Sequence, residues 1–545
     1  MTSSLNSQMA WWIIDQLVQQ GVHHFCIAPG SRSTPLALAA AHHLKAHLHI
    51  HYDERGLGFY TLGLAKAQQI PAAVIVTSGT AVGNLLPSVM EAHHSHIPLL
   101  LLTADRPPEL IDAGANQTTD QLKLFQNFTR GELYLPTSDP LVTERYVRSA
   151  IAHAVCLSKK TPGPFHVNWH IRAPLFTPPF PALAEGKAIH TTFSEQVPLH
   201  PTQLSHSGVI AIGTLPNPAD LNPILQLAKQ LQWPVFADIL SNARFQKTNE
   251  QIFYFDWILK KHPHLQPHTI LHFGERLTSK IYLEWAANAT RLIHVSPWQM
   301  LQDPSRLLTE RILSDIVPFC RTAQLEPAPD SWLAQWKQAD LETTLQLRAH
   351  FARSSLCTEA HAFHSFSTHF DPAFALYLGS GMPIRDANHF FFPSSSAGCF
   401  SNRGLSGIDG NIASAAGLSE GLKTPLAAWI GDQAALHDLN SLPLLTQTKH
   451  PVLLIISNNF GGGIFSHLPI AQDTEHFEQL FVNPHSWHFA SAAALFNIPY
   501  YKAESIEDFS SAWNAAKNKS GIIELITSRT VNFTFHQKIF SSCTT

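Results

Sequence analysis

Residues 71–107 read "PAAVIVTSGTAVGNLLPSVMEAHHSHIPLLLLTADRP", and this stretch decides the fold. Short apolar runs at 71–79 and 98–107 enclose residues 81–94, in which apolar positions recur at helical spacing. A strand, a helix and a second strand in this order form a βαβ unit, whose two strands lie parallel in one sheet. The stretch therefore predicts a parallel, doubly wound α/β sheet.

The same alternation extends from residue 21 to residue 170. Further strand-like runs are "HHFCIAPG", "HLHIHY" and "PFHVNW", and further helical segments cover 34–45 and 57–69. The segment before them, "MTSSLNSQMAWWIIDQLVQQ", is typical of an amphipathic helix, because it lacks the basic residues and cleavage site of a secretion signal. We therefore expect one α/β domain over residues 1–175.

A linker and two further α/β domains are predicted beyond it. Prolines at 174, 178, 179 and 181 forbid regular structure and predict a linker over 176–205. The runs "SGVIAIG", "WPVFADIL", "HTILHFGE" and "RLIHVSP" predict a central domain over 206–330, followed by a helical connection over 331–355. The runs "FALYLGSG", "PLAAWIGD", "PVLLIISNN" and "GIIELITS" predict a third domain over 356–545. The expected fold class is α/β, with three doubly wound parallel-sheet domains.

Composition narrows the class of protein. Charged residues make up 14% of the chain, against about 25% in an average soluble protein, so we expect much buried surface, including subunit interfaces. The formal net charge is -4 and there is no basic run, which argues against a nucleic-acid or anionic-membrane partner. No apolar stretch approaches the ~18 residues that span a bilayer. The six cysteines form no CxxC pair, and we expect reduced thiols in a cytoplasmic protein.

Polar residues gather where the strands of the third domain end, and ligands of parallel α/β sheets bind at such ends. Asp432 ends one strand-like run and Asn459 ends the next, with three glycines, 461–463, directly after. A carboxylate, an amide oxygen and a backbone carbonyl at one sheet edge make half of an octahedral Mg²⁺ shell. The residues alone equally allow an aspartate that caps a helix and asparagines in a turn.

The sequence lacks two other common phosphate-binding motifs. The run "GSGMPI" begins like a dinucleotide fingerprint at Gly379 and Gly381, but Ile384 occupies the place of the third glycine. The sequence has no GxxxxGK[ST] motif, which excludes a P-loop.

The run "HLHIHYDERGLGFY", residues 47–60, places Asp53 and Glu54 between a strand and a helix. Acidic side chains suit the positive N-terminal end of a helix, so the residues alone favour a capping role for both. The remaining motifs of the chain bear on this choice.

The Gly431-Asp432 and Asn458-Asn459 pairs, together with the lone Glu54 at a strand end, resemble the thiamine-diphosphate-dependent enzymes. More narrowly, six segments resemble the family of 2-succinyl-5-enolpyruvyl-6-hydroxy-3-cyclohexene-1-carboxylate synthases of menaquinone biosynthesis. These segments are "APGSRSTPLALA", "DERGLGFYTLGLAK", "TSGTAVGNLLPSVMEA", "LTADRPPEL…GANQTTDQ", "SNRGLSGIDG" and "SNNFGGGIFSHLP". The likeness covers essentially all of the first and third domains and is thinner in the central one.

The resemblance implies a transferase that decarboxylates 2-oxoglutarate and adds the succinyl-semialdehyde carbanion equivalent to isochorismate. Thiamine diphosphate and Mg²⁺ (or Mn²⁺) are the implied cofactors. Family members bind the cofactor between the first, aminopyrimidine-binding domain of one subunit and the third, diphosphate-binding domain of another, which implies a homodimer or homotetramer. Glu54 matches the glutamate that shares a proton with the aminopyrimidine, a role that needs a dry site. Asp53 is then the better candidate for the cap.

The resemblance also implies the remaining site residues. Asp432, Asn459 and the Gly461 carbonyl would hold the metal. Further cofactor contacts would come from Ser31, Thr77, Ser78, Gly79, Ile408, Gly431, Gln433, Ala434, Gly462 and Ile464. Both substrates are dicarboxylates and require paired cations, so substrate contacts would come from Arg32, Arg106, Asn116, Gln117, Lys280, Arg385, Arg403, Ile464 and Phe465.

Among these residues, Arg385 and Arg403 match the oxoglutarate side, whereas Arg32, Gln117 and Lys280 match the isochorismate side. With Glu54 these five form the predicted catalytic set. Each arginine taken alone could instead serve a structural ion pair.

Three departures from the family pattern bear on substrate affinity more than on the cofactor. Ser380-Gly381 stands where Asn-Ser is common, Ile281 follows Lys280 where arginine is common, and Ala434 replaces a frequent serine. Alternatives are a thiamine-diphosphate carboligase that acts on a monocarboxylate, a nicotinamide or flavin oxidoreductase, and a catalytically impaired relative. The cations at the strand ends argue against a monocarboxylate substrate, and the missing glycine fingerprint argues against an oxidoreductase. An impaired relative is disfavoured because Glu54, Asp432 and Asn459 are all present.

Overall fold

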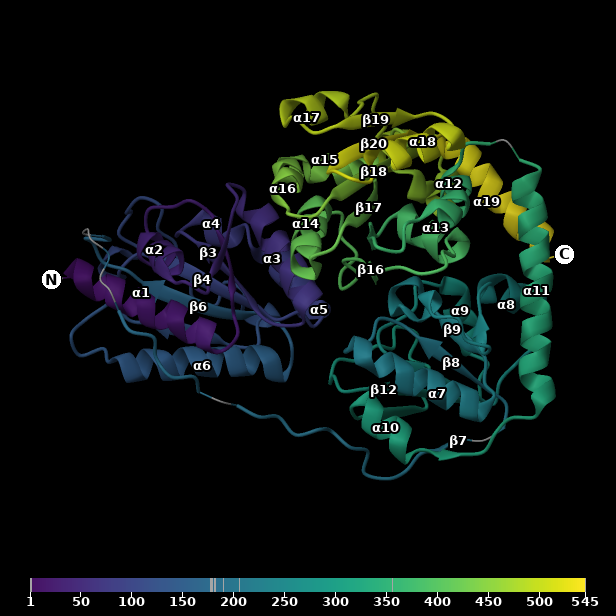
Figure 1. The fold of residues 1–545 in the computed structure, drawn as a ribbon, viewed down its shortest axis with the longest axis horizontal. Helices are drawn as coiled ribbons and strands as arrows, with labels where there is room; N and C mark the ends of the chain where they lie inside the picture. The colour runs from purple at the N-terminus through teal and green to yellow at the C-terminus, as the bar shows by residue number, and fades with distance from the viewer. Residues whose placement is uncertain are drawn as a thin grey trace.

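The computed structural model describes residues 2–176, 180, 183–189, 191–204, 206–354 and 356–544. Figure 1 shows three α/β units, with the N-terminal unit at one end and the third unit lying above the central one. Each unit contains a six-stranded sheet in which every pairing is parallel, which confirms the predicted fold class. Some predicted features lie outside the described residues: Pro178, Pro179 and Pro181 of the linker, the boundary residues Ser205 and Ser355, and the side chain of Cys543.

The sheet of the N-terminal domain has the strand order β2-β1-β3-β4-β6-β5. Its strands are β1 (His24–Ile27), β2 (His47–Ile50), β3 (Ala72–Val76), β4 (Leu99–Asp105), β5 (Glu132–Leu135) and β6 (Phe165–His170). One face is covered by α1 (Thr2–Gln19), α2 (Thr34–His42) and α6 (Glu144–Lys160). The other face is covered by α3 (Glu54–Gln68), α4 (Thr80–Gly83) and α5 (Leu86–His94).

The central domain has the strand order β10-β9-β8-β11-β12-β13. Its strands are β8 (Gly208–Ile212), β9 (Val235–Ala237), β10 (Gln251–Ile252), β11 (Thr269–Phe273), β12 (Arg291–Ser296) and β13 (Glu310–Leu313). Helices α7 (Leu221–Leu231) and α10 (Ile316–Thr322) cover one face, and α8 (Phe255–Lys261), α9 (Lys280–Ala286) and α11 (Asp330–Ala352) cover the other. A two-stranded pair joins β7 (Gln203–Leu204) to β14 (Gln324–Leu325).

The third domain has the strand order β16-β15-β17-β18-β20-β19. Its strands are β15 (Ala375–Leu378), β16 (Cys399–Phe400), β17 (Leu426–Gly431), β18 (Val452–Asn458), β19 (Tyr500–Ala503) and β20 (Gly521–Ile526). Helices α12 (Glu359–His369), α13 (Met382–Phe390), α18 (Ile506–Ala516) and α19 (Arg529–Thr544) cover one face. Helices α14 (Asn411–Leu422), α15 (Asp432–His437), α16 (Leu442–Gln447) and α17 (Ala490–Leu495) cover the other.

The structure differs from the sequence prediction mainly at the sheet edges. Strands β5, β10, β13, β16 and β19 were not predicted, and each lies at the edge of its sheet. Edge strands are short and partly solvated, so they lack the continuous apolar runs of central strands. The helix predicted over 81–94 is also interrupted between α4 and α5, because Pro87 lacks a backbone N–H and occupies the first turn of α5.

One apolar cluster joins the N-terminal and third domains within the chain. It contains residues of α3 and of α14, whose axes cross closely. A Cβ added to Gly63 would lie 2.3 Å from the Ser414 carbonyl oxygen, and one added to Gly417 would lie 2.1 Å from the Tyr60 carbonyl oxygen. The two helix backbones can therefore touch only because both positions are glycine.

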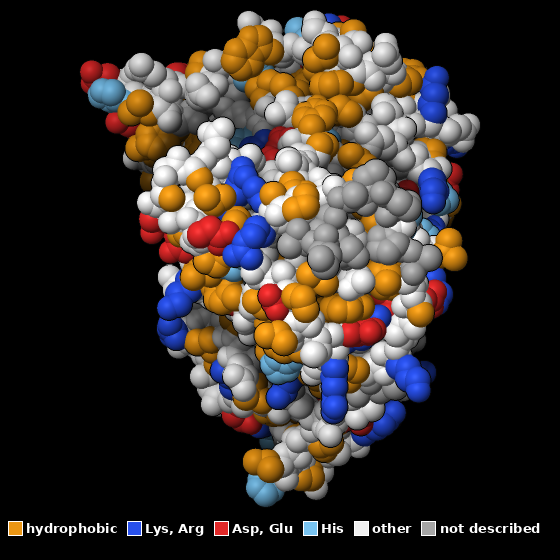
Figure 2. Space-filling view, turned by 90° about the vertical axis from the view of Figure 1, so that its left-hand side faces the viewer, with side chains coloured by type: hydrophobic (Ala, Val, Ile, Leu, Met, Phe, Trp, Pro, Cys, Tyr) orange, Lys and Arg blue, Asp and Glu red, His pale blue; other side chains and the backbone are white. Residues whose placement is uncertain are grey.

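The face of the protein seen in Figure 2 carries charged side chains of both signs. Figure 2, which looks onto the side where the N-terminal domain lies, shows acidic and basic side chains interspersed among exposed apolar ones. Among the described residues, no helix has both the length and the apolar character needed to cross a bilayer.

We expect Gly63→Ala to destabilise the protein, because its methyl group would enter the contact between α3 and α14. Overpacking of this kind costs about 1–3 kcal/mol, which thermal or denaturant unfolding would measure. Gly83→Ala is the control, since nothing lies within 4 Å of its added Cβ. Equal stability of the two variants would contradict the close contact.

Candidate active site

The turn between β2 and α3 separates the roles of Asp53 and Glu54. Asp53 is the N-cap of α3, and its Oδ1 accepts hydrogen bonds from the backbone N–H of Arg55 at 3.0 Å and of Gly56 at 3.4 Å. The predicted capping role of Asp53 is thereby confirmed. Glu54 is half-exposed, and Asn84 donates to its Oε2 at 3.2 Å. The Glu54 carboxylate is therefore free of capping and faces partly outward.

The other first-domain candidates lie in the loops that follow β1, β3 and β4. Ser78 and Gln117 form a two-way contact: Ser78 Oγ donates to the Gln117 carbonyl at 2.8 Å, and Gln117 Nε2 donates to the Ser78 carbonyl at 3.1 Å. Gly79 has a φ of 82°, and its N–H donates to Gln121 Oε1. Thr77, Ser78 and Gly79 are buried, whereas Ser31, Asn116 and Gln117 are exposed. The loops after β3 and β4 are thus fixed against each other.

Arg32 and Arg106 lie close to each other beside these loops and could bind an anion together. Arg32 is buried and donates from Nη1 to the Ile171 carbonyl at 2.7 Å. The Nε atoms of both arginines are buried without a hydrogen-bond partner. Burial, followed by the positive charge of Arg106, lowers the pKa of Arg32. Two adjacent guanidinium groups with unused donors fit a carboxylate ligand.

In the third domain the predicted metal ligands meet where β17 and β18 end. Asp432 is 3% exposed, and its Oδ2 accepts from the Gly461 N–H at 2.9 Å. Asn459 Oδ1 is buried without a hydrogen-bond partner. Burial raises the pKa of Asp432, which a nearby cation would oppose. The Gly461 carbonyl accepts from the Gly463 N–H at 2.8 Å and keeps a second lone pair for a ligand.

The loop after β18 can pack closely against residues 465 and 482 only because positions 461 and 462 are glycine. Gly461 has a φ of 151°, and a Cβ there would lie 2.8 Å from Val482 Cγ1. A Cβ on Gly462 would lie 2.7 Å from Phe465 Cδ2. An orphaned amide oxygen, a buried carboxylate and this glycine loop fit a divalent cation with a diphosphate. Ile464 and Phe465 are half-buried beside the loop, and Ile408 is 44% exposed.

Arg385 and Arg403 come together, and they bring a residue that sequence reasoning missed. Burial, followed by the positive charge of Arg385, lowers the pKa of Arg403 to about 10, and Arg276 of the central domain acts in the same direction. Arg276 also opposes the charge of Arg385, whose pKa burial lowers. Arg276 belongs to the run "FGERLTSK". Its position directly after a predicted strand could have identified it as a candidate site residue. Lys280 is exposed at the start of α9.

The structure shows what the residues that depart from the family pattern contact. The Ser380 hydroxyl donates to the Asn402 carbonyl at 2.8 Å and so holds the loop that carries Arg403. Ala434 is 8% exposed and belongs to the core shared by the first and third domains. Ile281 is half-buried and packs against the central core.

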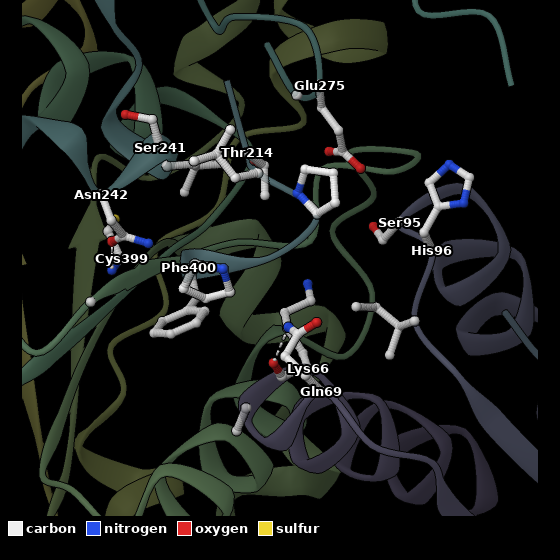
Figure 3. A pocket seen from close by; sticks show the side chains of 18 of the residues that line it. Lys66, Gln69, Ser95, His96, Thr214, Ser241, Asn242, Glu275, Cys399 and Phe400 are labelled. Atoms are coloured by element: carbon white, nitrogen blue, oxygen red, sulfur yellow. Dashed lines mark hydrogen bonds between the residues drawn. The ribbon is translucent and has the colours of Figure 1, made fainter. Parts of the chain in front are cut away.

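A cavity of about 890 Å³ lies where the three domains meet, with Arg403 in its wall. Figure 3 shows Lys66 reaching into it from α3 and Glu275 from the opposite wall. Lys66 Nζ donates to the Ser401 carbonyl at 2.6 Å and to Asn402 Oδ1 at 2.9 Å. Burial lowers the pKa of Lys66 and raises that of Glu275 to about 7.

A carboxylate of the first domain completes this support. Glu91 Oε1 accepts from the Gly404 N–H at 2.9 Å, and its Oε2 accepts from the Leu405 N–H at 2.8 Å. Lys66 and Glu91 therefore clamp residues 401–405 from both sides of Arg403. Neither residue was predicted, because each acts on a loop more than 300 positions away.

The two halves of the site thus have complementary chemistry. The first-domain half offers a half-exposed carboxylate and an arginine pair, and the third-domain half offers oxygen ligands, a glycine loop and an arginine cluster. In the described part of the chain, no hydrogen bond or ion pair joins Glu54 to residues 431–465. The arrangement can bind a divalent cation, a diphosphate and small carboxylates.

Comparisons with known proteins agree with this geometry. Residues 8–124 match the family "Thiamine pyrophosphate enzyme, N-terminal TPP binding domain". Residues 190–377 match "Middle domain of thiamine pyrophosphate", and residues 379–525 match "Thiamine pyrophosphate enzyme, C-terminal TPP binding domain".

Three relatives that match over nearly their full length carry the name 2-succinyl-5-enolpyruvyl-6-hydroxy-3-cyclohexene-1-carboxylate synthase. The protein from Salinibacter ruber is 36% identical, over 97% of this chain and 95% of its own. The protein from Bacillus velezensis is 36% identical, over 97% of this chain and 96% of its own. The protein from Psychromonas ingrahamii is 33% identical, over 96% and 93%.

We expect Glu91→Gln to loosen the clamped loop, because an amide can accept from one of the two N–H groups but not from both. A hydrogen bond to a charged group contributes about 1.5–3 kcal/mol, so its loss should make hydrogen exchange of a peptide over residues 401–407 faster. Glu420→Gln is the control, since Glu420 pairs with an exposed lysine, Lys449. Unchanged exchange in Glu91→Gln would contradict the clamp.

Proposed function

The chain belongs to the thiamine pyrophosphate enzymes and, among them, to the 2-succinyl-5-enolpyruvyl-6-hydroxy-3-cyclohexene-1-carboxylate synthase family, and from this membership we propose its reaction. The enzyme decarboxylates 2-oxoglutarate and joins the remaining four-carbon unit to isochorismate, a step of menaquinone biosynthesis. The observation that carries the proposal is identity of 36% over 97% of the chain, together with a third-domain site of matching chemistry.

Thiamine diphosphate, when bound, supplies a carbon nucleophile and stabilises the charge that remains when CO₂ leaves. Asp432, Asn459 Oδ1 and the Gly461 carbonyl would hold Mg²⁺ (or Mn²⁺). Gly431, Gln433, Ala434 and Gly462 would lie along the diphosphate, while Ile408 and Ile464 would contact the rings. Ser31, Thr77, Ser78 and Gly79 would line the opposite side. Glu54 would hold a proton at its carboxylate toward the aminopyrimidine.

The cations of the chain would bind and orient the two dicarboxylates. Arg385 and Arg403 are assigned to the oxoglutarate side. Arg32, Gln117 and Lys280 are assigned to the isochorismate side, with Ile464 and Phe465 as an apolar wall. Arg106 and Asn116 would add further substrate contacts. The unpaired Nε atoms of Arg32 and Arg106 support the assignment. A monocarboxylate substrate would leave part of this positive charge unpaired.

A second copy of the chain would complete the site. Glu54 is half-exposed in the single chain, although proton sharing at a carboxyl needs a dry site. Apolar side chains near the third-domain half are exposed as well: Ile408 is 44% exposed, Leu468 43% and Trp487 62%. A homodimer or homotetramer that sets the first domain of one copy on the third domain of another would cover both halves.

We place the reaction in the cytoplasm. The cysteines whose side chains are described are free thiols, as in proteins of reducing compartments.

The proposed reaction is tested by mixing the protein with thiamine diphosphate, Mg²⁺, 2-oxoglutarate and isochorismate. We expect CO₂ release coupled to loss of isochorismate, and loss of both when Mg²⁺ is removed by a chelator. Pyruvate in place of 2-oxoglutarate should give little product, because its single carboxylate cannot pair all the cations. Equal turnover of pyruvate would contradict the proposed substrate.

We expect Glu54→Gln to lower kcat by about 10²–10⁴-fold, the usual contribution of a positioned proton-transfer group. Binding of thiamine diphosphate, followed by calorimetry, should persist because the metal ligands are intact. Asp53→Asn is the control, since the amide oxygen still caps α3. Full activity of Glu54→Gln would remove Glu54 from the reaction.

A further inference from the structure

Glu359 is a buried carboxylate next to the metal half of the site. It is the first residue of α12, it is 2% exposed, and its Oε1 accepts from Asn459 Nδ2 at 2.9 Å. The same oxygen accepts from Asn532 Nδ2 at 2.9 Å and from Thr527 Oγ1 at 3.4 Å. Neither the sequence motifs nor the reaction uses this residue.

The contact with Glu359 decides which way the Asn459 amide faces. Nδ2 can only donate and a carboxylate oxygen without a proton can only accept, so Nδ2 turns to Glu359 and Oδ1 turns to the opposite side. That Oδ1 is buried without a hydrogen-bond partner, and Asn459 and Asp432 directly follow the paired strands β18 and β17. An amide with its two ends reversed would present N–H groups to a cation and repel it.

We infer that Glu359 is a positioning residue that fixes the Asn459 amide with its oxygen toward the divalent cation. The inference rests on the proposed function, since that function supplies the cation. Groups that orient metal ligands from behind typically change metal affinity 10–100-fold when they are replaced.

Glu359 is itself held by the C-terminal helix. The Asn532 side chain on α19 accepts from the Glu359 backbone N–H at 3.0 Å through Oδ1, while its Nδ2 donates to Glu359 Oε1. Both ends of Asn532 are therefore assigned, and Glu359 cannot rotate without breaking them. The relay from Asn532 through Glu359 to Asn459 links α19 to the metal half of the site.

A reciprocal exchange of acid and amide tests the inference. Titration of Mn²⁺ into protein in the presence of a fixed excess of thiamine diphosphate, followed by calorimetry, gives an apparent metal Kd without turnover. We expect Glu359→Gln to weaken Mn²⁺ binding about 10–100-fold. Asn459→Asp should also weaken it, because two carboxylates then face each other. The double variant should bind better than Asn459→Asp alone, since the introduced amide can donate to the introduced carboxylate, whose second oxygen stays available for the metal.

Asp340→Asn is the matched control for the loss of a buried acid. Asp340 is 8% exposed and accepts from the backbone N–H groups of Phe253 and Tyr254 in the central region, away from the metal half. Its Mn²⁺ Kd should equal that of the unmodified protein. An equal loss in this control, or a double variant that gives no recovery, would overturn the inference. Failure of the unmodified protein to bind thiamine diphosphate in a metal-dependent manner would instead contradict the proposed function.

Discussion

The contact between α3 and α14 is the constraint on which the site depends. Gly63 and Gly417 let the two backbones touch, so the first and third domains share one apolar core. Helix α3 then acts along its whole length: its first turn carries Glu54, and Arg55 Nη2 donates to the His437 carbonyl at 2.8 Å. Near its other end Lys66 holds the loop of Arg403. A shift of this one helix would therefore move parts of both halves.

The free protein buries carboxylates and guanidinium groups whose charged forms the proposed ligands would stabilise. Burial raises the pKa of Glu359 to about 7 and raises that of Asp432, while burial lowers the pKa of Arg32, Arg385 and Arg403. Each shift shows that the charged form is disfavoured where it stands. A divalent cation at the carboxylates and dicarboxylates at the guanidinium groups would relieve both costs, so ligand binding should stabilise the fold.

Central strands and the residues that follow them could be predicted from sequence, because a strand buried on both faces needs a continuous apolar run. Edge strands such as β13 and β19 could not, since they are four residues long and mostly only partly buried, and so lack a continuous apolar run. The capping role of Asp53 was expected once the family resemblance had assigned Glu54 to the cofactor, and the structure places the Asp53 carboxylate at the start of α3. Lys66, Glu91 and Glu359 were missed because their partners lie at least 100 positions away. No local pattern marks such contacts, and only the packed domains bring them together.

The proposed assembly of two chains explains both the partial exposure of Glu54 and the exposed apolar side chains of the third domain. A carboxyl that shares a proton with a ligand must lose its water. Within the single chain, however, Glu54 stays half-exposed and accepts a hydrogen bond from the side-chain amide of Asn84. Ile408, Leu468 and Trp487 leave apolar surface open on the other half. Covering that surface is favourable by about 25 cal/mol per Å², and the same step removes water from the acid. Subunit association would then supply both the stability and the dryness, so the site would exist only where two chains meet.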